Sequence, residues 1–259
     1  MDLNIAGRKA IVCASSRGLG KACAVALANE GVDVWISGRN QTTLDITAQE
    51  IQALGKGKVT TVLADVTTEE GRNALFEACP TPDIVVNNAG GPPPGDFREW
   101  DQSDWFSAIN DNMYSAIDMI KRSIDGMVDR GFGRIVNITS VAVKLPQAEL
   151  GLSNGARAGL TGFIAGIARG PAQHNVTINN LLPGFIDTDR MRNVVKAKAD
   201  AANKEVEQFS DTFFGNMPAK RPGDADEFGA TCAFLCSQQA AYITAQNLLV
   251  DGGLYPGTF

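Results

Sequence analysis

The chain has 259 residues, of which 44% are hydrophobic and 20% are charged, values that are ordinary for a soluble globular protein. Its formal net charge of −6 argues against nucleic acid or an anionic membrane as the main partner. No apolar stretch approaches the ~18 uninterrupted residues of a membrane span, and the N-terminus lacks the pattern of a signal peptide. We therefore expect one α/β domain over residues 1–259, located in the cytoplasm and acting on a small molecule.

The five cysteines are odd in number and lie mostly in apolar segments, which predicts reduced core thiols rather than disulfides. They are Cys13, Cys23, Cys79, Cys232 and Cys236. The sequence has a single histidine and no CxxC pair, so we expect no metal site.

Short apolar runs rich in Val and Ile alternate along the chain with longer segments of helical period. The runs are Ala10–Cys13, Val32–Ser37, Val59–Ala64, Ile84–Asn87, Arg134–Ile138, Thr177–Leu182 and Asn247–Val250. The segments between them are Gly18–Glu30, Thr42–Ala53, Thr68–Cys79, Ser103–Arg130, Ser153–Arg169 and Asp224–Cys236. Continuous apolar runs are typical of strands buried on both faces. The alternation predicts a Rossmann-type α/β fold, a doubly wound parallel sheet of about seven strands with helices on both faces.

Two segments interrupt this alternation, and both follow strands at the edge where such sheets bind ligands. Gly90–Gly95 is a stiff loop rich in Gly and Pro. Residues 188–220 form a polar and aromatic insertion that we expect to contact the substrate.

The first apolar run leads into a glycine-rich turn and then a helix. This turn, Ser15, Ser16, Arg17, Gly18, Leu19 and Gly20, would let backbone N–H groups approach a pyrophosphate at the helix N-terminus. A tight turn without any ligand is the alternative interpretation.

The end of the second apolar run indicates which dinucleotide is bound. An NAD site would carry Asp or Glu there to bind the ribose 2′-hydroxyl, whereas this chain has Arg39. With Arg17 in the first turn, two guanidinium groups suit a 2′-phosphate, so we expect NADP(H) as cofactor. Two solvated surface arginines are the alternative.

With these motifs, the chain resembles the short-chain dehydrogenase/reductase (SDR) family over essentially its whole length, in particular the 3-oxoacyl-carrier-protein reductases. The motifs are the glycine turn, Asp65-Val66, Asn87-Asn88-Ala89-Gly90 and Pro183-Gly184. The resemblance implies that Asp65 and Val66 flank the adenine and that Asn88, Ala89 and Gly90 support the ribose. It further implies that Pro183, Gly184, Ile186 and Thr188 line the nicotinamide and pyrophosphate. The family turn usually opens with Gly, where this chain has Ala14.

The family's catalytic tetrad of Asn, Ser, Tyr and Lys is matched only in part. Asn112 and Ser140 fit the first two positions, but Ser153 and Arg157 stand where the Tyr-x-x-x-Lys pair is expected. A phenol has a pKa near ~10 and an aliphatic alcohol is a far weaker acid, so Ser153 is a poor general acid on its own. Arg157 can bind ribose hydroxyls and stabilise an oxyanion, but it cannot shuttle a proton.

Several proton donors therefore stay open. Ser140 and Ser153 could relay a proton from water beside Arg157, or Lys144 could donate it from the following loop. An exposed loop amine is the simpler interpretation of Lys144, packing is the simpler role for Tyr114, and His174 is expected at the surface. Glu149 and Asp187 are expected near the mouth of the site, and Asp187 could equally begin a helix.

The leading functional hypothesis is an NADP(H)-dependent oxidoreductase acting on a small or medium carbonyl, alcohol or imine. A catalytically silent NADP(H)-binding sensor or assembly subunit is the alternative, and a lyase or isomerase with a structural nucleotide is a third. The segments 103–130 and 153–169 carry apolar side chains on one side, and the resemblance implies a homotetramer or dimer built on them.

Overall fold

The computed structural model describes residues 2–54 and 56–258. Within them, all the strands pair in parallel in one seven-stranded sheet of order β3-β2-β1-β4-β5-β6-β7. The strands are β1 (Lys9–Val12), β2 (Asp33–Gly38), β3 (Val59–Leu63), β4 (Ile84–Asn87), β5 (Gly133–Ile138), β6 (Val176–Pro183) and β7 (Asn247–Val250). The strand order reverses between β1 and β4, which is where doubly wound sheets open a crevice for ligands. The expected fold class is confirmed.

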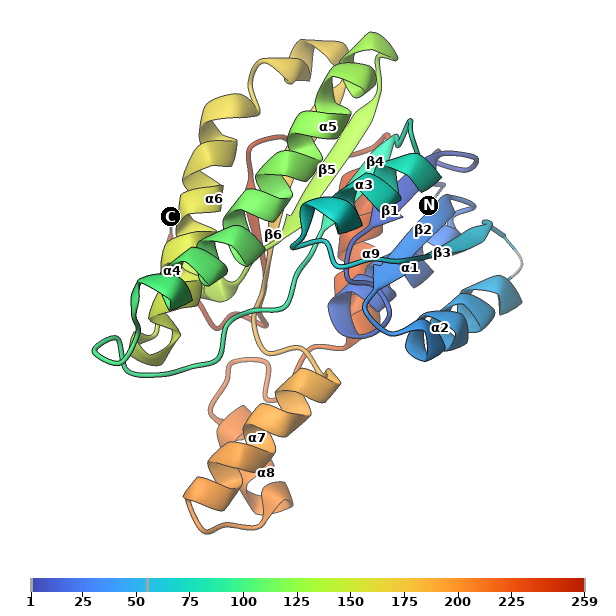
Figure 1. Cartoon of the computed structure of the whole chain (residues 1–259). Coiled ribbons are helices and arrows are strands. Elements are labelled where there is room, and N and C mark those ends of the chain that lie inside the picture. The colour runs from blue at the N-terminus through green and yellow to red at the C-terminus, as the bar shows by residue number, and fades with distance from the viewer. Residues whose placement is uncertain (1, 55, 259) are drawn as a thin grey trace.

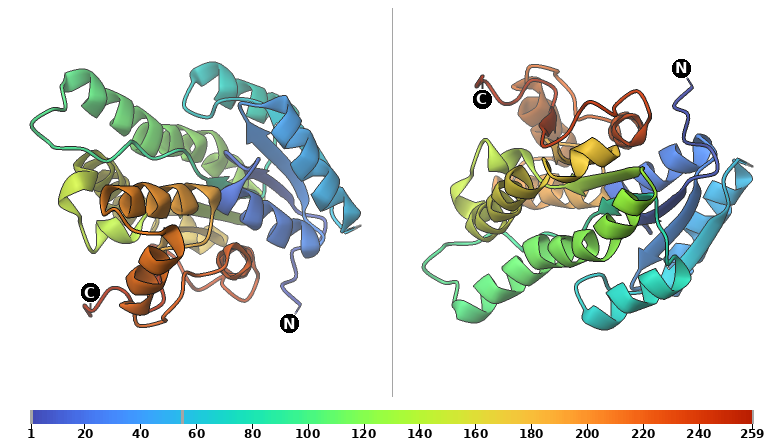
Figure 2. Two further views of the ribbon diagram at one scale, coloured as in Figure 1. Left: turned by 90° about the horizontal axis from the view of Figure 1, so that it is seen from below. Right: turned by 90° about the horizontal axis from the view of Figure 1, so that it is seen from above.

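Helices cover both faces of the sheet (Figures 1 and 2). One face packs against α1 (Gly18–Asn29), α2 (Gln41–Ala53) and α9 (Ala225–Cys236). The other packs against α3 (Glu69–Ala78), α5 (Ser115–Asp129) and α6 (Gly151–Ile167), with α4 (Gln102–Ile109) preceding α5. Short turns of helix complete the chain at η2 (Val141–Val143), η3 (Ala148–Leu150) and η4 (Pro171–His174).

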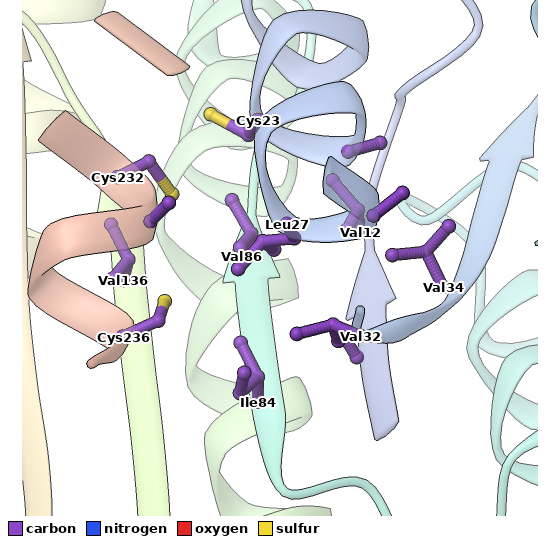
Figure 3. Close-up of a cluster of buried hydrophobic side chains, with 14 of the residues drawn as sticks. Val12, Cys23, Leu27, Val32, Val34, Ile84, Val86, Val136, Cys232 and Cys236 are labelled. Carbon is purple, nitrogen blue, oxygen red and sulfur yellow. The ribbon is translucent and has the colours of Figure 1, made fainter. Parts of the chain in front are cut away.

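Successive strand residues enter opposite cores, as the pleat requires. Val12 packs into the layer with α1 and α9, while its neighbour Ile11 packs into the layer with α5 and α6. Figure 3 shows the first layer, in which Cys23, Cys232 and Cys236 lie among aliphatic side chains. All five cysteines are free and buried, as expected.

The edge strand β3 corrects the expectation of runs buried on both faces. Its Leu63 is 58% exposed, and Thr60 and Thr61 are not buried. β3 is the edge strand of the sheet, where helices cover its faces less completely, so the side chains of Thr60 and Leu63 reach solvent.

The long helix expected over 103–130 is interrupted. A π-helical turn, η1 (Asn110–Tyr114), separates α4 from α5. Such turns add one residue per turn, and they occur often at functional sites. The apolar pattern alone did not reveal the interruption, because the helical period continues on both sides of it.

The insertion at 188–220 is largely helical, with α7 (Asp189–Ala201) and α8 (Val206–Gly215). Figure 1 shows these two helices lying together beyond the carboxyl ends of the strands. Phe213 stacks on Phe209 and contacts Phe185 edge to face. The region of α7 and α8 therefore has a small apolar core of its own. None of the helices in the described residues combines the length and apolar character needed to cross a bilayer.

Candidate functional site

The turn between β1 and α1 is held to β2 by a reciprocal pair of serines. Ser15 Oγ donates to the Val12 carbonyl at 2.6 Å and accepts from the Ser37 N–H at 3.0 Å. Ser37 Oγ accepts from the N–H of Ala14 at 3.0 Å. The turn is therefore fixed before any ligand binds.

Ala14 opens this turn in the left-handed region, with φ of +46°. Glycine adopts such a conformation without cost, whereas for alanine it costs about 1–2 kcal/mol. The Ala14 carbonyl accepts from Asn88 Nδ2 at 3.1 Å, which links the turn to the segment after β4. A Cβ on Gly20 would lie only 2.5 Å from that same carbonyl oxygen, so glycine is required there.

The N-terminus of α1 has free donors. Arg17 occupies the N-cap position without accepting a side-chain hydrogen bond, so no side chain blocks the first N–H groups of Gly18, Leu19 and Gly20. Such an end attracts phosphate groups. Thr188 Cγ2 lies 3.9 Å from the position of a Cβ on Gly18, so the segment after β6 meets the segment after β1 at this point.

The arginines expected to bind a 2′-phosphate are both exposed. Arg39 is 76% exposed at its side chain and lies 3.7 Å from a carboxylate oxygen of Asp65. Ser16 lies beneath the end of β2, where its Oγ would be 2.8 Å from a Cβ on Gly38. The ends of β1, β2 and β3 thus bring together the turn residue Ser16, Arg39 and Asp65.

The segment after β6 is anchored at several points. The Gly184 N–H donates to the Val250 carbonyl at 2.9 Å, and Ile186 pairs with Gly223. Thr188 caps α7 through the Met191 N–H, and Asp187 instead forms an ion pair with Arg192 at 2.6 Å. Thr188, and not Asp187, is therefore the start of that helix.

Ser153 and Arg157 form a buried pair on α6, with 8% and 9% of each residue exposed. Arg157 Nε donates to Ser153 Oγ at 3.1 Å, and its Nη1 donates to the carbonyls of Ile138 and Thr139 at 3.0 Å. Burial, and next the charge of Arg190, lowers the pKa of Arg157 to about 10. The group keeps its positive charge at neutral pH.

Asn112 lies in the π-helical turn and is buried, and its Oδ1 has no hydrogen-bond partner in the structure. It lines a small polar cavity with Asn87, Asn137 and Arg157. The volume of this cavity, about 20 Å³, accommodates one water molecule. Asn112 and Arg157 thus meet at the same cavity.

Ser140 follows β5, and its Oγ accepts from the Ala142 N–H at 3.1 Å. Lys144 Nζ lies 5.5 Å from the centre of the Tyr255 ring, so the C-terminal segment covers this amine. Tyr114 is half exposed beneath the Arg72 guanidinium, and Glu149 and His174 are exposed. The surface position expected for His174 is confirmed.

The chain is similar along its whole length to reductases of known family. The family described as Enoyl-(Acyl carrier protein) reductase matches residues 13–255. The NADPH-dependent reductase BacG of Bacillus subtilis (strain 168) is 34% identical over 255 residues, covering 95% of this chain and 97% of that protein. The 3-oxoacyl-[acyl-carrier-protein] reductase FabG of Vibrio cholerae serotype O1 is 33% identical over 253 residues, covering 98% and 99%. The crystal structure of L-sorbose reductase from Gluconobacter frateurii, complexed with NADPH and L-sorbose, has a TM-score of 0.94 and 27% identity and covers 100% of both chains.

The chain belongs to the short-chain dehydrogenase/reductase family.

One feature of this SDR was not predicted from its sequence. Four asparagines at corresponding positions of β4, β5, β6 and β7 form a ladder of side-chain hydrogen bonds. Asn87 Nδ2 donates to Asn137 Oδ1 at 2.8 Å, Asn137 Nδ2 to Asn180 Oδ1 at 3.1 Å, and Asn180 Nδ2 to Asn247 Oδ1 at 2.8 Å. Asn87 and Asn137 line the same cavity as Asn112, so the ladder fixes the positions of two of the side chains that line it.

Proposed function

We propose that this SDR is an NADP(H)-dependent oxidoreductase that acts on a small or medium carbonyl, alcohol or imine through a non-standard catalytic centre. The observation that carries the proposal is the buried Ser153–Arg157 pair, which adjoins the Asn112 cavity at the spacing of the family's Tyr-x-x-x-Lys. Two relatives, an NADPH-dependent reductase and a reductase complexed with NADPH, support the same reaction class.

The residues of the cleft fit a dinucleotide phosphate. The unblocked N–H groups at the start of α1 suit the diphosphate. Arg39 and Arg17 would bind the 2′-phosphate, because guanidinium groups bind phosphate oxygens in pairs. The other residues assigned to the cofactor are Ser15, Ser16, Gly18, Leu19, Asp65, Val66, Asn88, Ala89, Gly90, Arg157, Pro183, Gly184, Ile186 and Thr188.

Arg157 supplies the positive charge that the family's lysine would supply. When bound, NADPH supplies the hydride. Arg157 holds a fixed positive charge next to the reacting centre, where it stabilises negative charge developing on a carbonyl oxygen. Within the part of the chain that the structure describes, its Nη2 is free and carries two N–H groups, so one of them can bind a ribose hydroxyl, as the family's lysine does, and leave the other available.

Ser153 acts as the hydrogen-bond donor to the substrate oxygen. Because Ser153 Oγ already accepts from Arg157 Nε, its own O–H is left to donate. The adjacent guanidinium stabilises negative charge that develops at this point of the site. Ser140 serves as the second hydroxyl, and water from the solvent returns the proton to Ser153.

The helices α7 and α8 would cover the substrate. Their apolar cluster at Phe185, Met191 and Phe213 supports a partly hydrophobic substrate. We regard residues 1–259 as one domain in which 188–220 is the substrate-contacting insertion.

The chain would work in the cytoplasm as a homo-oligomer. Free thiols support a reducing compartment. Phe106, Ile109 and Tyr114 are exposed along α4 and η1, the segment expected to pair with a second copy. Light scattering coupled to size-exclusion chromatography tests this, and a monomer would contradict it.

The experiment that tests the proposed function is NADPH oxidation in the presence of a panel of ketones, aldehydes and imines. We expect turnover with at least one class, faster with NADPH than with NADH. The matched variant is the double substitution Ser153→Tyr/Arg157→Lys, which should gain ordinary ketone reduction because the rest of the site is retained. Tight NADPH binding without turnover of any substrate would contradict the proposal and favour a sensor or assembly subunit.

A further inference from the structure

Two arginines from different helices approach the same point beside the loop after β4. A Cβ on Gly91 would lie 3.0 Å from both Nη1 and Nη2 of Arg190, on α7, and 3.4 Å from Nη2 of Arg157, on α6. The end nitrogens of the two guanidinium groups are therefore no farther apart than the sum of these distances. Only a residue without a side chain at position 91 keeps this space open.

Two of the donors that face this point, Arg157 Nη2 and Arg190 Nη1, have no hydrogen-bond partner among the described residues. Arg157 uses Nε and Nη1 for its three hydrogen bonds, and its Nη2 has no partner among the described residues. Arg190 makes one long contact, from Nη2 to the Pro92 carbonyl at 3.5 Å. Within residues 2–54 and 56–258, neither arginine has a carboxylate within ion-pair distance.

The nearest acidic residues of α7 are engaged elsewhere. Asp187 and Asp189 flank Arg190 in sequence, and both pair with Arg192, at 2.6 Å and 2.8 Å. The charge of Arg190 is felt by Arg157, where it adds to the effect of burial in lowering the pKa. Two guanidinium groups this close repel each other unless an anion lies between them.

We propose that Arg157 and Arg190 bind a carboxylate of the substrate beside Gly91, so that the compound reduced is an oxo acid or another carboxylate-bearing carbonyl. This rests on the proposed function for its reaction, though not for the binding site itself. Charge-assisted hydrogen bonds of about 2.7–2.9 Å from each arginine fit a carboxylate between them. Arg157 also donates a hydrogen bond to Ser153 Oγ. The substrate carboxylate on Arg157 would therefore lie close to the Ser153 hydroxyl, which contacts the substrate carbonyl.

The diphosphate of the cofactor has similar chemistry and is the other source of such an anion. The free N–H groups for a diphosphate lie at the start of α1, beyond the end of β1, whereas Gly91 follows β4 and Arg157 contacts the end of β5. We therefore assign the arginine pair to the substrate.

The test compares 2-, 3- and 4-oxo acids with their own methyl esters, measured by calorimetry on the wild type, Arg190→Gln and Arg192→Gln. We expect at least one acid to bind about tenfold more tightly than its ester. Arg190→Gln should remove that preference and leave ester binding within about twofold, since one charged partner is lost. Arg192→Gln should behave as the wild type, because Arg192 lies on the same helix but is paired with Asp187 and Asp189.

Three results would overturn the assignment. The first is an equal affinity for every acid and its ester. The second is a loss of NADPH affinity in Arg190→Gln as large as the loss of affinity for the acid. The third is a loss of affinity for the acid in Arg192→Gln as large as the loss in Arg190→Gln. The second result would move the arginine pair to the cofactor diphosphate. Because calorimetry needs no turnover, acids that bind through Arg190 without being reduced would contradict the proposed function and leave the carboxylate site intact.

Discussion

Arg157 donates from Nε to Ser153 Oγ, one helical turn earlier on α6, at 3.1 Å. The two residues that we expect at the positions of the family's Tyr and Lys are thus joined by a direct hydrogen bond, and each of them is more than nine-tenths buried. A guanidinium that cannot give up its proton is held against a hydroxyl that is a weak acid. On the proposed function, this contact places the fixed positive charge of Arg157 beside the hydroxyl that donates to the substrate oxygen.

Arg39→Ala should reduce the affinity for NADPH by about tenfold or more and leave the affinity for NADH unchanged. A hydrogen bond between a guanidinium and a phosphate is worth about 1.5–3 kcal/mol. NADH has no 2′-phosphate, so its affinity does not depend on this hydrogen bond. The dissociation constants of both cofactors measure the effect. Arg169→Ala, an exposed arginine at the far end of α6, is the matched control. A ratio of the two constants that does not change would refute the role of Arg39.

Ala14→Gly should raise the free energy of unfolding by about 0.5–1 kcal/mol. The substitution relieves a left-handed alanine, and part of the gain is offset by the greater freedom of glycine in the unfolded chain. Urea denaturation measures the change. Ala245 also has a left-handed φ, of +60°, and Ala245→Gly should give a similar gain. Lower stability of Ala14→Gly than of the wild type would contradict the strain assigned to this turn.

Asn137→Ala should lower the free energy of unfolding by about 2–4 kcal/mol, because Asn87 Nδ2 and Asn180 Oδ1 both lose a buried partner. Asn247 ends the ladder at a partly exposed strand, so in Asn247→Ala only Asn180 Nδ2 loses its partner and the cost should be about half as large, about 1–2 kcal/mol. Chemical denaturation of the two variants compares them directly. Equal losses at the two positions would show that the ladder is not a cooperative buried network.

The stability of the protein should depend on Glu227 between pH 4.5 and about 2. A hydrogen bond from Arg221, with a second from the Asp224 N–H, lowers the pKa of Glu227 from 4.5 to about 2. A carboxyl group with a lowered pKa stabilises the fold above its unfolded pKa and loses that effect as pH falls through the folded pKa. The melting temperatures of the wild type and Glu227→Gln should therefore converge as pH falls over this range. A difference that stays constant with pH would be inconsistent with this ion pair.

The sheet and the glycine-rich strand-to-helix turn could be predicted because their signals are local. The strand-to-helix turn at Ser15–Gly20 and the Arg39 that ends β2 are each visible in a few consecutive residues. The exposed edge of β3 was also visible in its Thr60-Thr61 pair, but it was read as part of a buried run. The π-helical turn at Asn110–Tyr114 leaves no such signal, because the apolar pattern is helical on both sides.

The contacts that were not predicted join residues far apart in the chain. The asparagine ladder depends on the register of four strands, and a sequence without that register does not place Asn137 opposite Asn87 and Asn180. The approach of Arg190 to Arg157 likewise depends on how α7 folds back over the loop at Gly91. Arg190 carried no sequence signal beyond its place in the first turn after Thr188.

The role of Ser153 in proton donation is tested most directly by the kcat of NADPH-dependent reduction in Ser153→Ala, with the substrate that the wild type reduces best. The account predicts a fall in kcat of about 100-fold, the range expected for losing a positioned proton donor. The affinity for NADPH should stay within about twofold, because Arg157 keeps its bonds to Ile138 and Thr139. Thr42→Ala, at an exposed threonine of α2, should behave as the wild type. An unchanged kcat in Ser153→Ala would contradict the account.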